Sequence, residues 1–214
     1  MRIIAGKYRR RKLLTKPGLT TRPITDRAKE PLFERLESHL EGARVADVFA
    51  GTGTLGLESL SRGARSVVFI EQDRQAGELL QKNVDAIGVT DVCLCWRADA
   101  MRCSFRPKGV PDFVPFDVIF FDPPYRLIEA LQPPSPLFKA LERLGRSTVS
   151  ATDAMLCLRA PAESTFTVPS VWQPERSLSI GGMDIHLYQL DRPPDEHGDV
   201  SHIAEPLPDE TSSA

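Results

Sequence analysis

Residues 45–56 read VADVFAGTGTLG, an apolar segment followed by a glycine-rich turn and the start of a helix. Gly51, Gly53 and Gly56 have the G-x-G-x-x-G spacing, which brings the backbone close to a ligand at a helix N-terminus. Glu71 lies 20 residues after Gly51, where a carboxylate can accept both hydroxyls of a ribose. The pattern predicts an adenosine-containing cofactor and leaves three readings open: NAD, S-adenosylmethionine, or a tight turn without a ligand.

Strands and helices alternate on either side of this motif. Apolar runs predict strands at 45–50, 66–71, 92–96, 116–121 and 154–160. Helical spacing predicts helices through Leu55 and Leu60, over 74–87 with Gly88 as the stop, and over 135–145. Such alternation is typical of a parallel sheet covered by helices on both faces, with the ligand beyond the carboxyl ends of the strands.

The two ends of the folded region depart from this alternation. A helix is predicted from Asp26 as N-cap, although Pro31 favours a regular start nearer Lys29. Two final strands near 175–180 and 183–190 flank Gly181-Gly182, a hairpin-type turn, and predict one antiparallel strand in the sheet.

Asp122-Pro123-Pro124-Tyr125 directly follows the apolar strand VIFF. The two prolines hold the chain extended and leave carbonyl groups exposed, because proline has no N–H to pair in a ladder. One carboxylate, one free carbonyl and one aromatic ring at a strand end suit an exocyclic amine on a nucleobase, which the ring can stack upon. The alternative is a proline turn with a packed tyrosine.

Charge divides the chain into three segments. The net charge of −2 combines +9 over residues 1–29, −5 over 30–190 and −6 over 191–214. We expect a basic N-terminal arm at 1–25, with two short strands around Gly6-Lys7, a folded domain at 26–190 and a disordered acidic tail at 191–214. The arm would contact RNA phosphates, with Tyr8 able to stack on a base, unless it is only a solvated face; its basic residues are Lys7, Arg9, Arg10, Arg11 and Lys12.

Several patterns are absent from the sequence. No run of about 18 apolar residues and no apolar signal-peptide core occurs, so we expect a cytoplasmic protein. Cys93 and Cys95 alternate on one strand face, and these two, Cys103 and Cys157 lack CxxC spacing, which predicts free thiols in a reducing compartment. His197 and His202 lie in the tail, and no metal site is predicted.

Longer stretches of the chain resemble one family. RIIAGKYRRRKL, TRPITDRAKEPLFERL, DVFAGTGTLGLESLSRGA, FIEQD and FFDPPY, within residues 2–190, are similar to bacterial 16S ribosomal RNA guanine-N2 methyltransferases of the small-subunit methyltransferase D type. That family's name specifies guanine 966. The resemblance implies a Rossmann-like class I methyltransferase, an α/β fold with a mostly parallel seven-stranded sheet, a C-terminal antiparallel hairpin and a small N-terminal β-hairpin extension. The sequence departs from the family pattern at Pro31, at LCLRA in the fifth strand and in the proline-rich loop 107–115.

The resemblance also implies roles for particular residues. S-adenosylmethionine would be held at its methionine part by residues of the glycine loop, at its ribose by Glu71, and at its adenine by Asp99 with Ala100; the loop residues are Asp47, Phe49, Ala50, Gly51, Thr52 and Gly53. Asp122, Pro123, Pro124 and Tyr125 would hold the target guanine, while Arg22, Thr25 and Arg27 would lie beside the active site and contact RNA. The expected substrate is 16S rRNA within a small-subunit assembly intermediate, methylated by a monomer.

Three other functions remain open. Adenine-N6 methylation of DNA also uses a DPPY motif, but little folded chain is left for a target-recognition region. An NAD-dependent oxidoreductase would leave DPPY unexplained. An inactive RNA-binding assembly factor would have no need of Asp47, Glu71, Asp99 and Asp122.

Overall fold

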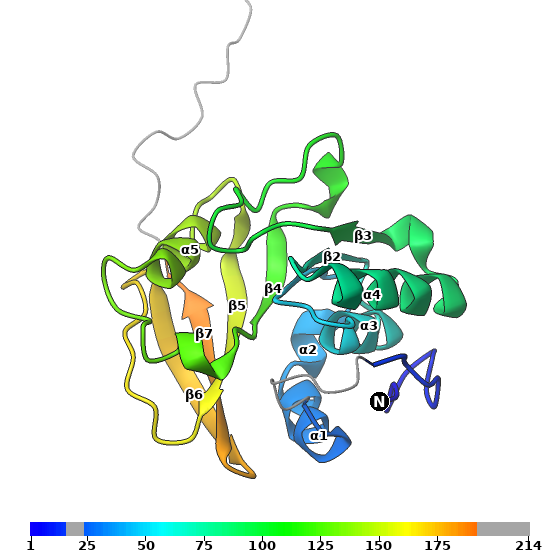
Figure 1. Cartoon of the computed structure of the whole chain (residues 1–214), viewed down its shortest axis with the longest axis horizontal. Coiled ribbons are helices and arrows are strands. Elements are labelled where there is room, and N and C mark those ends of the chain that lie inside the picture. The colour runs from blue at the N-terminus through cyan, green and yellow to red at the C-terminus, as the bar shows by residue number, and fades with distance from the viewer. Residues whose placement is uncertain (16–23, 192–214) are drawn as a thin grey trace, which may run out of the picture.

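A computed structural model describes residues 1–15 and 24–191 and contains one seven-stranded sheet in the order β3-β2-β1-β4-β5-β7-β6 (Figure 1). Its strands are β1 (Arg44–Val48), β2 (Ser66–Ile70), β3 (Cys93–Trp96), β4 (Phe116–Phe121), β5 (Ser150–Pro161), β6 (Trp172–Ile180) and β7 (Met183–Leu190). The α-helices are α1 (Asp26–Arg35), α2 (Glu37–Leu40), α3 (Thr54–Ser61), α4 (Arg74–Ile87) and α5 (Pro136–Leu144). Short 3₁₀ turns occupy Thr90–Val92, Pro111–Phe113 and Tyr125–Leu127.

Strand directions confirm the expected mixed sheet. β3, β2, β1, β4 and β5 are mutually parallel, whereas β7 pairs antiparallel with both β5 and β6. β7 is therefore the one strand of the described sheet that runs against the rest. Gly181 and Gly182 both have positive φ, 58° and 81°, as the tight turn between β6 and β7 requires.

The chain winds outward from β1 in both directions. β1 leads through α3 to β2 on one side, whereas β4 lies on the other side of β1 and continues to β5. Strand order therefore switches between β1 and β4, which is where ligands bind in open α/β sheets.

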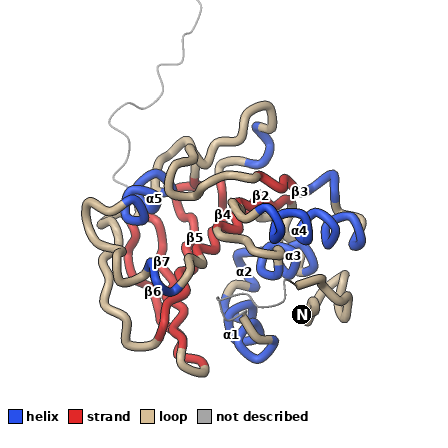
Figure 2. Tube along the Cα trace, viewed as in Figure 1, coloured by secondary structure: helices blue, strands red, loops and turns tan. Residues whose placement is uncertain are grey.

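The strands form the centre of the domain, with helices packed around them (Figure 2). The sheet separates two hydrophobic clusters. One face, with Val45 and Phe120, packs against the N-terminal segment and α1 to α4; the other, with Ala46 and Phe121, packs against α5 and the loop after β3. Cys93 and Cys95 both pack on the first cluster, as their alternation predicts, and burial raises the pKa of both thiols.

The first helix begins earlier than predicted. Thr25, rather than Asp26, is the N-cap, since its hydroxyl oxygen accepts a hydrogen bond from the Ala28 N–H at 3.3 Å. Asp26 instead occupies the acidic first turn, and Pro31 lies inside the helix. Burial of Leu32 and Phe33, at 1% and 0% exposure, offsets the hydrogen bond that the proline cannot donate.

Other boundaries also differ from the predictions. The two strands expected around Gly6-Lys7 are reduced to a single antiparallel bridge between Arg2 and Lys12 that closes a series of turns. β5 starts at Ser150 and β6 at Trp172, each a few residues early. The linker positions 16–23, with Arg22, and the tail from residue 192 lie outside the described residues. None of the described helices is both long and apolar enough to cross a membrane.

Candidate active site

Acidic side chains follow or end the four neighbouring strands on the parallel side of the sheet. Asp99 follows β3, Glu71 follows β2, Asp47 lies near the end of β1, and Asp122 follows β4. Because these strands are parallel neighbours, their carboxyl ends share one edge. The structure therefore brings together the four acids that the sequence singled out, across the point where strand order switches.

Asp47 is the most deeply buried of these acids, with 2% exposure. Its carboxylate accepts a hydrogen bond from the Gly56 N–H at 2.9 Å, so it ties β1 to the first turn of α3. Burial, together with the nearby charges of Asp122 and Glu71, raises the pKa of Asp47 to about 8. The site thus holds a carboxyl group whose charge is costly without a cation.

The glycine loop between β1 and α3 is held by Glu71. One carboxylate oxygen of Glu71 accepts the Gly51 N–H at 2.8 Å, and the other accepts the Asp73 N–H at 2.7 Å. Burial raises the pKa of Glu71 even so. Gly51 has a φ of 56°, and a Cβ added there would meet no atom within 4 Å, so its surroundings leave room for a ligand.

The other residues of the glycine loop are held in place by packing against neighbouring strands and helices. Phe49 has a φ of 63°, which is unusual for a residue other than glycine. Its ring packs edge-on against the ring of Phe121, with 5.4 Å between the ring centroids. A Cβ at Gly53 would lie 2.4 Å from Leu80 Cδ1, and one at Gly56 would lie 2.3 Å from Phe69 Cε1. Both glycines therefore allow α3 and the loop to pack against the sheet. Ala50 and Thr52 are buried within the same loop.

The turn after β3 is built around Asp99. Its side-chain oxygen accepts the Met101 N–H at 2.9 Å, and Ala100 is buried. Arg143 of α5 fastens this turn by donating to the carbonyl oxygens of Ala100, Met101 and Cys103 at 2.8–3.2 Å. Sequence reasoning missed Arg143, because its distance from Asp99 along the chain hides the contact.

Asp122 is held by an arginine from the neighbouring strand. Arg159 of β5 donates from Nε to Oδ1 of Asp122 at 2.7 Å, and the two side chains are only 7% and 16% exposed. Burial raises the pKa of Asp122, while the charge and hydrogen bond of Arg159 act in the lowering direction. Arg159 was not among the predicted site residues. The sequence feature that could have indicated it is the single arginine in LCLRA, a stretch treated above only as a departure from the family pattern.

The two prolines present their carbonyl groups differently. The Pro124 oxygen accepts the Leu127 N–H at 2.8 Å, whereas no described residue donates a hydrogen bond to the Pro123 oxygen. Tyr125 begins the following 3₁₀ turn, and its ring lies 5.5 Å from the Arg159 guanidinium carbon. One carboxylate, one open carbonyl and one aromatic ring therefore stand together after β4.

The acids point to the charge of the ligand. Asp47 forms no ion pair with a described residue, and the charges of Asp122 and Glu71 raise its pKa further. Such a cluster favours an organic cation and repels a pyrophosphate. Within residues 1–15 and 24–191, no group of three or more metal-ligating side chains converges. The donor set therefore fits a cationic nucleoside better than a dinucleotide.

Glu58 of α3 docks the N-terminal arm on the domain. This fully buried carboxylate accepts the N–H groups of Ile4 and Ala5 at 2.8 and 3.1 Å and pairs with Lys29 Nζ at 3.2 Å and Arg62 Nε at 3.0 Å. Ser61 adds contacts to Ala5, Lys7 and Tyr8. Beyond the arm's bridge, Asn83 binds both backbone groups of Leu14 and the Thr52 carbonyl of the glycine loop.

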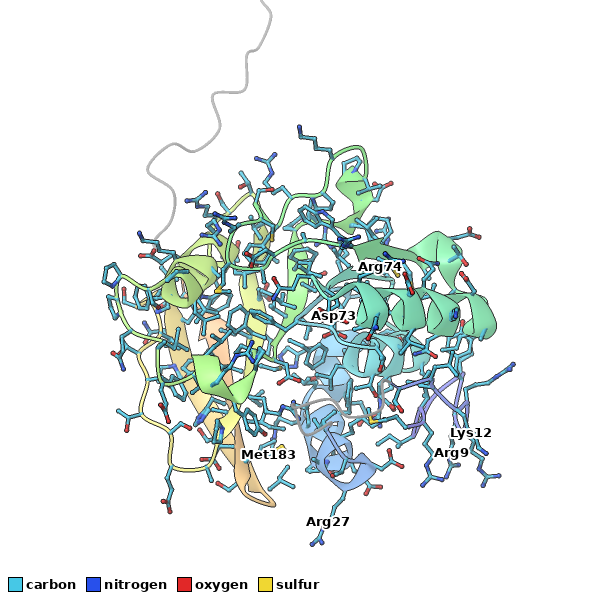
Figure 3. All side chains as sticks on the ribbon, viewed as in Figure 1. Arg9, Lys12, Arg27, Asp73, Arg74 and Met183 are labelled. Atoms are coloured by element: carbon cyan, nitrogen blue, oxygen red, sulfur yellow. The ribbon has the colours of Figure 1, made fainter. Side chains whose placement is uncertain are left out.

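Among the described residues, the basic side chains of positions 1–29 comprise an exposed group and one buried lysine. Arg9 and Lys12 extend outward from the N-terminal segment, and Arg27 extends from α1 on the same side of the molecule (Figure 3). Lys7, Arg10 and Arg11 are also exposed, whereas Lys29, counted in the +9 segment, is fully buried against Glu58. Tyr8 is half-buried against the core with Lys7 over its ring, and Thr25 caps α1.

The sequence and the fold of this chain are similar to those of known proteins. Residues 1–189 match the family described as conserved hypothetical protein 95. Ribosomal RNA small subunit methyltransferase D of Escherichia coli K12 is 33% identical over 192 residues, 88% of this chain and 89% of that protein. The solved structure of the Escherichia coli protein yhhF is 34% identical with a TM-score of 0.72, covering 89% of this chain and 98% of that one.

A more distant structure shares the fold alone. An RNA methyltransferase from Salinibacter ruber, solved with S-adenosyl-L-homocysteine, is 16% identical with a TM-score of 0.54, covering 79% of this chain and 97% of that one.

Proposed function

Because the chain belongs to the family of ribosomal RNA small subunit methyltransferase D, we infer that it is an S-adenosylmethionine-dependent methyltransferase acting on ribosomal RNA. The site fits this cofactor, since S-adenosylmethionine carries a positive sulfonium and a positive ammonium group. When bound, it supplies an electrophilic methyl group. The acidic edge of the sheet offers the complementary charge.

We propose how the chain's own residues hold the cofactor. Asp47 and the loop 49–53 face the methionine part, where the buried carboxylate of Asp47 gains a cationic partner. Glu71 already orders the loop through Gly51, and its carboxylate oxygens can accept the ribose hydroxyls as well. Asp99 and Ala100 form the turn that closes on the adenine.

The observation that carries the proposed target is the arrangement after β4. Oδ2 of Asp122 and the Pro123 oxygen are two acceptors for the two hydrogens of an exocyclic amine, and Tyr125 offers a ring for stacking. The amine of guanine is a poor nucleophile, because its lone pair is delocalised into the ring. Acceptance of both hydrogens favours a pyramidal nitrogen, and positioning supplies much of the rate. We therefore propose methylation at N2 of a guanine in 16S rRNA.

The ribosomal RNA substrate and the exposed basic arm together suggest a ribosomal particle as the substrate. We propose that a monomer acts in the cytoplasm on a small-subunit assembly intermediate, in which the target base is still accessible. Arg9, Lys12 and Arg27 lie on one side of the molecule (Figure 3) and would contact phosphates there, together with Arg11, which is exposed in the same segment.

The decisive experiment maps the methyl group. Small subunits from a strain lacking this gene would be incubated with the protein and S-adenosylmethionine labelled in the methyl group. We expect one labelled N2-methylguanine in 16S rRNA, located by nucleoside analysis and primer extension. Labelled N6-methyladenine in a DNA substrate, or no transfer to RNA, would overturn the proposal.

Gly53→Ala is expected to weaken cofactor binding about tenfold or more. Its φ of 82° is strained for any residue with a Cβ, and the added atom would lie 2.4 Å from Leu80 Cδ1, so the loop backbone or the Leu80 side chain must shift. Isothermal titration with S-adenosylmethionine measures the effect. Gly77→Ala is the matched control, since Gly77 lies in α4 with no atom within 4 Å of the new Cβ. Equal affinities for the two variants would contradict the role of the loop.

Reversing two charges of the arm tests the RNA contact. Arg9→Glu with Arg11→Glu should weaken RNA binding and reduce the slope of log K against log salt by about 1.4 to 1.8, because two phosphate contacts are lost. The matched control is Lys139→Glu with Arg146→Glu, two exposed residues on and just after α5, which packs on the face of the sheet opposite to the arm. An unchanged slope in the arm variant would exclude a phosphate-contacting arm.

A further inference from the structure

Arg159 is a cation buried in the proposed target-base site. The parallel register of β4 and β5 pairs Phe121 with Leu158, so the residues that follow, Asp122 and Arg159, come side by side. The Nε–Oδ1 distance is 2.7 Å, and Arg159 is 7% exposed. A buried arginine is costly unless it is paired, so the ion pair with Asp122 fixes the place of the Arg159 guanidinium.

Arg159 also contacts the aromatic member of the site. Its guanidinium carbon lies 5.5 Å from the centroid of the Tyr125 ring, within the range of a cation–π interaction. One side chain therefore touches both the carboxylate and the ring that we assign to the target base.

We propose that Arg159 is a positioning residue for the target base, holding the Asp122 carboxylate and the Tyr125 ring in one arrangement. This inference rests on the proposed function. By occupying Oδ1, Arg159 turns Oδ2 into the acceptor for the amine. By lying against the ring, it sets the plane on which the base stacks.

The pairing also decides what Asp122 can do chemically. Burial raises the pKa of Asp122, and Arg159 is the group that opposes this rise; Asp47 on β1 adds negative charge nearby, and Tyr125 covers the guanidinium. An ionised carboxylate only accepts hydrogen bonds, whereas a protonated one also donates. Guanine presents adjacent donors, N1–H and the 2-amino group, whereas N1 of adenine is an acceptor. A carboxylate kept ionised therefore suits guanine.

The test compares three substitutions of Arg159 by single-turnover methyl transfer to small subunits across pH. Arg159→Met should lower the rate at pH 7 about 100-fold. The lost partner lets the pKa of Asp122 rise, so the acid limb of the profile should move to higher pH, and part of the rate should return at high pH. Arg159→Gln, which keeps a donor but no charge, should move the limb in the same direction. Arg159→Lys, which keeps the charge, should leave the limb in place with a reduced rate.

Arg44→Met is the matched control. Arg44 also pairs with an aspartate of β4, Asp117, at 3.0 Å, but at the opposite edge of the sheet. The Arg44 variant keeps Asp47, so Asp47 contributes to its pH profile as it does in the Arg159 variants. Any rate loss in the Arg44 variant should be independent of pH. If Arg159 had only a structural role, its variants would also lose rate equally at every pH.

The outcomes separate this inference from the proposed function. If the wild-type protein transfers no methyl group to guanine, the proposed function fails. If it does, and folded Arg159→Met and Arg159→Gln keep the wild-type acid limb, only the role of Arg159 is overturned. If Arg159→Met does not fold, the Arg159→Gln and Arg159→Lys variants provide the test. An acid limb that moves to higher pH in Arg159→Gln but not in Arg159→Lys supports the role of Arg159. Acid limbs at the same pH in both variants exclude it.

Discussion

Asp122→Asn is expected to reduce methyl transfer about 100- to 1000-fold while S-adenosylmethionine still binds. The amide presents N–H donors where the carboxylate presents only acceptors. It therefore either opposes the hydrogens of the target amine or opposes Arg159, whose Nε now donates to Oδ1 at 2.7 Å. Asp122→Ala removes the acceptor altogether and should be at least as slow. Single-turnover transfer of a labelled methyl group and calorimetric titration of the cofactor measure the two effects.

The matched control for this loss is Asp117→Asn. Asp117 lies near the amino end of β4, the strand that Asp122 follows, and also accepts hydrogen bonds from an arginine, Arg44, at 3.0 Å. It therefore reports what a weakened arginine pair on β4 costs without touching the site. Turnover of the Asp122 variants close to that of the Asp117 variant would overturn the assignment of Asp122.

Glu58→Leu should lower the free energy of unfolding by about 3 to 5 kcal/mol. The substitution removes the partner at 3.2 Å from the fully buried ammonium of Lys29, which keeps only the longer ion pair with Asp26 at 3.7 Å. It also removes the acceptor of the Ile4 and Ala5 N–H groups. Denaturant unfolding measures the change. Because those N–H groups belong to the arm, RNA affinity should fall as well, although every exposed arginine of the arm is retained.

Two controls isolate the buried pair. Glu58→Leu combined with Lys29→Met should recover part of the stability, because the buried ammonium that lost its nearer partner is then removed as well. Glu78→Gln breaks the ion pair with Arg74 on the surface of α4, where both side chains are more than half exposed, and should leave unfolding unchanged. A Glu58 variant as stable as the Glu78 variant would contradict the docking role of Glu58.

Local patterns predicted most of the architecture. The period of apolar residues and the glycine stops located the strands around the motif and the helix α4, with Gly88 in the left-handed conformation as its cap. Where patterns failed, competing local signals were involved: Thr25 and Asp26 are both good caps, and the proline in α1 is outweighed by the buried face of Leu32 and Phe33.

The sequence by itself determined the parallel sheet, the glycine loop and the acids that end its strands, because these depend on periodicity and on residues a few positions apart. Only the tertiary structure decided the partners of those acids. Arg159 meets Asp122 across 37 positions of sequence, Arg143 reaches the turn at Ala100 across 43, and Glu58 meets the Ala5 N–H across 53. Such contacts depend on strand register and on helix packing, and burial makes them obligatory once formed, because a charge removed from water must be paired.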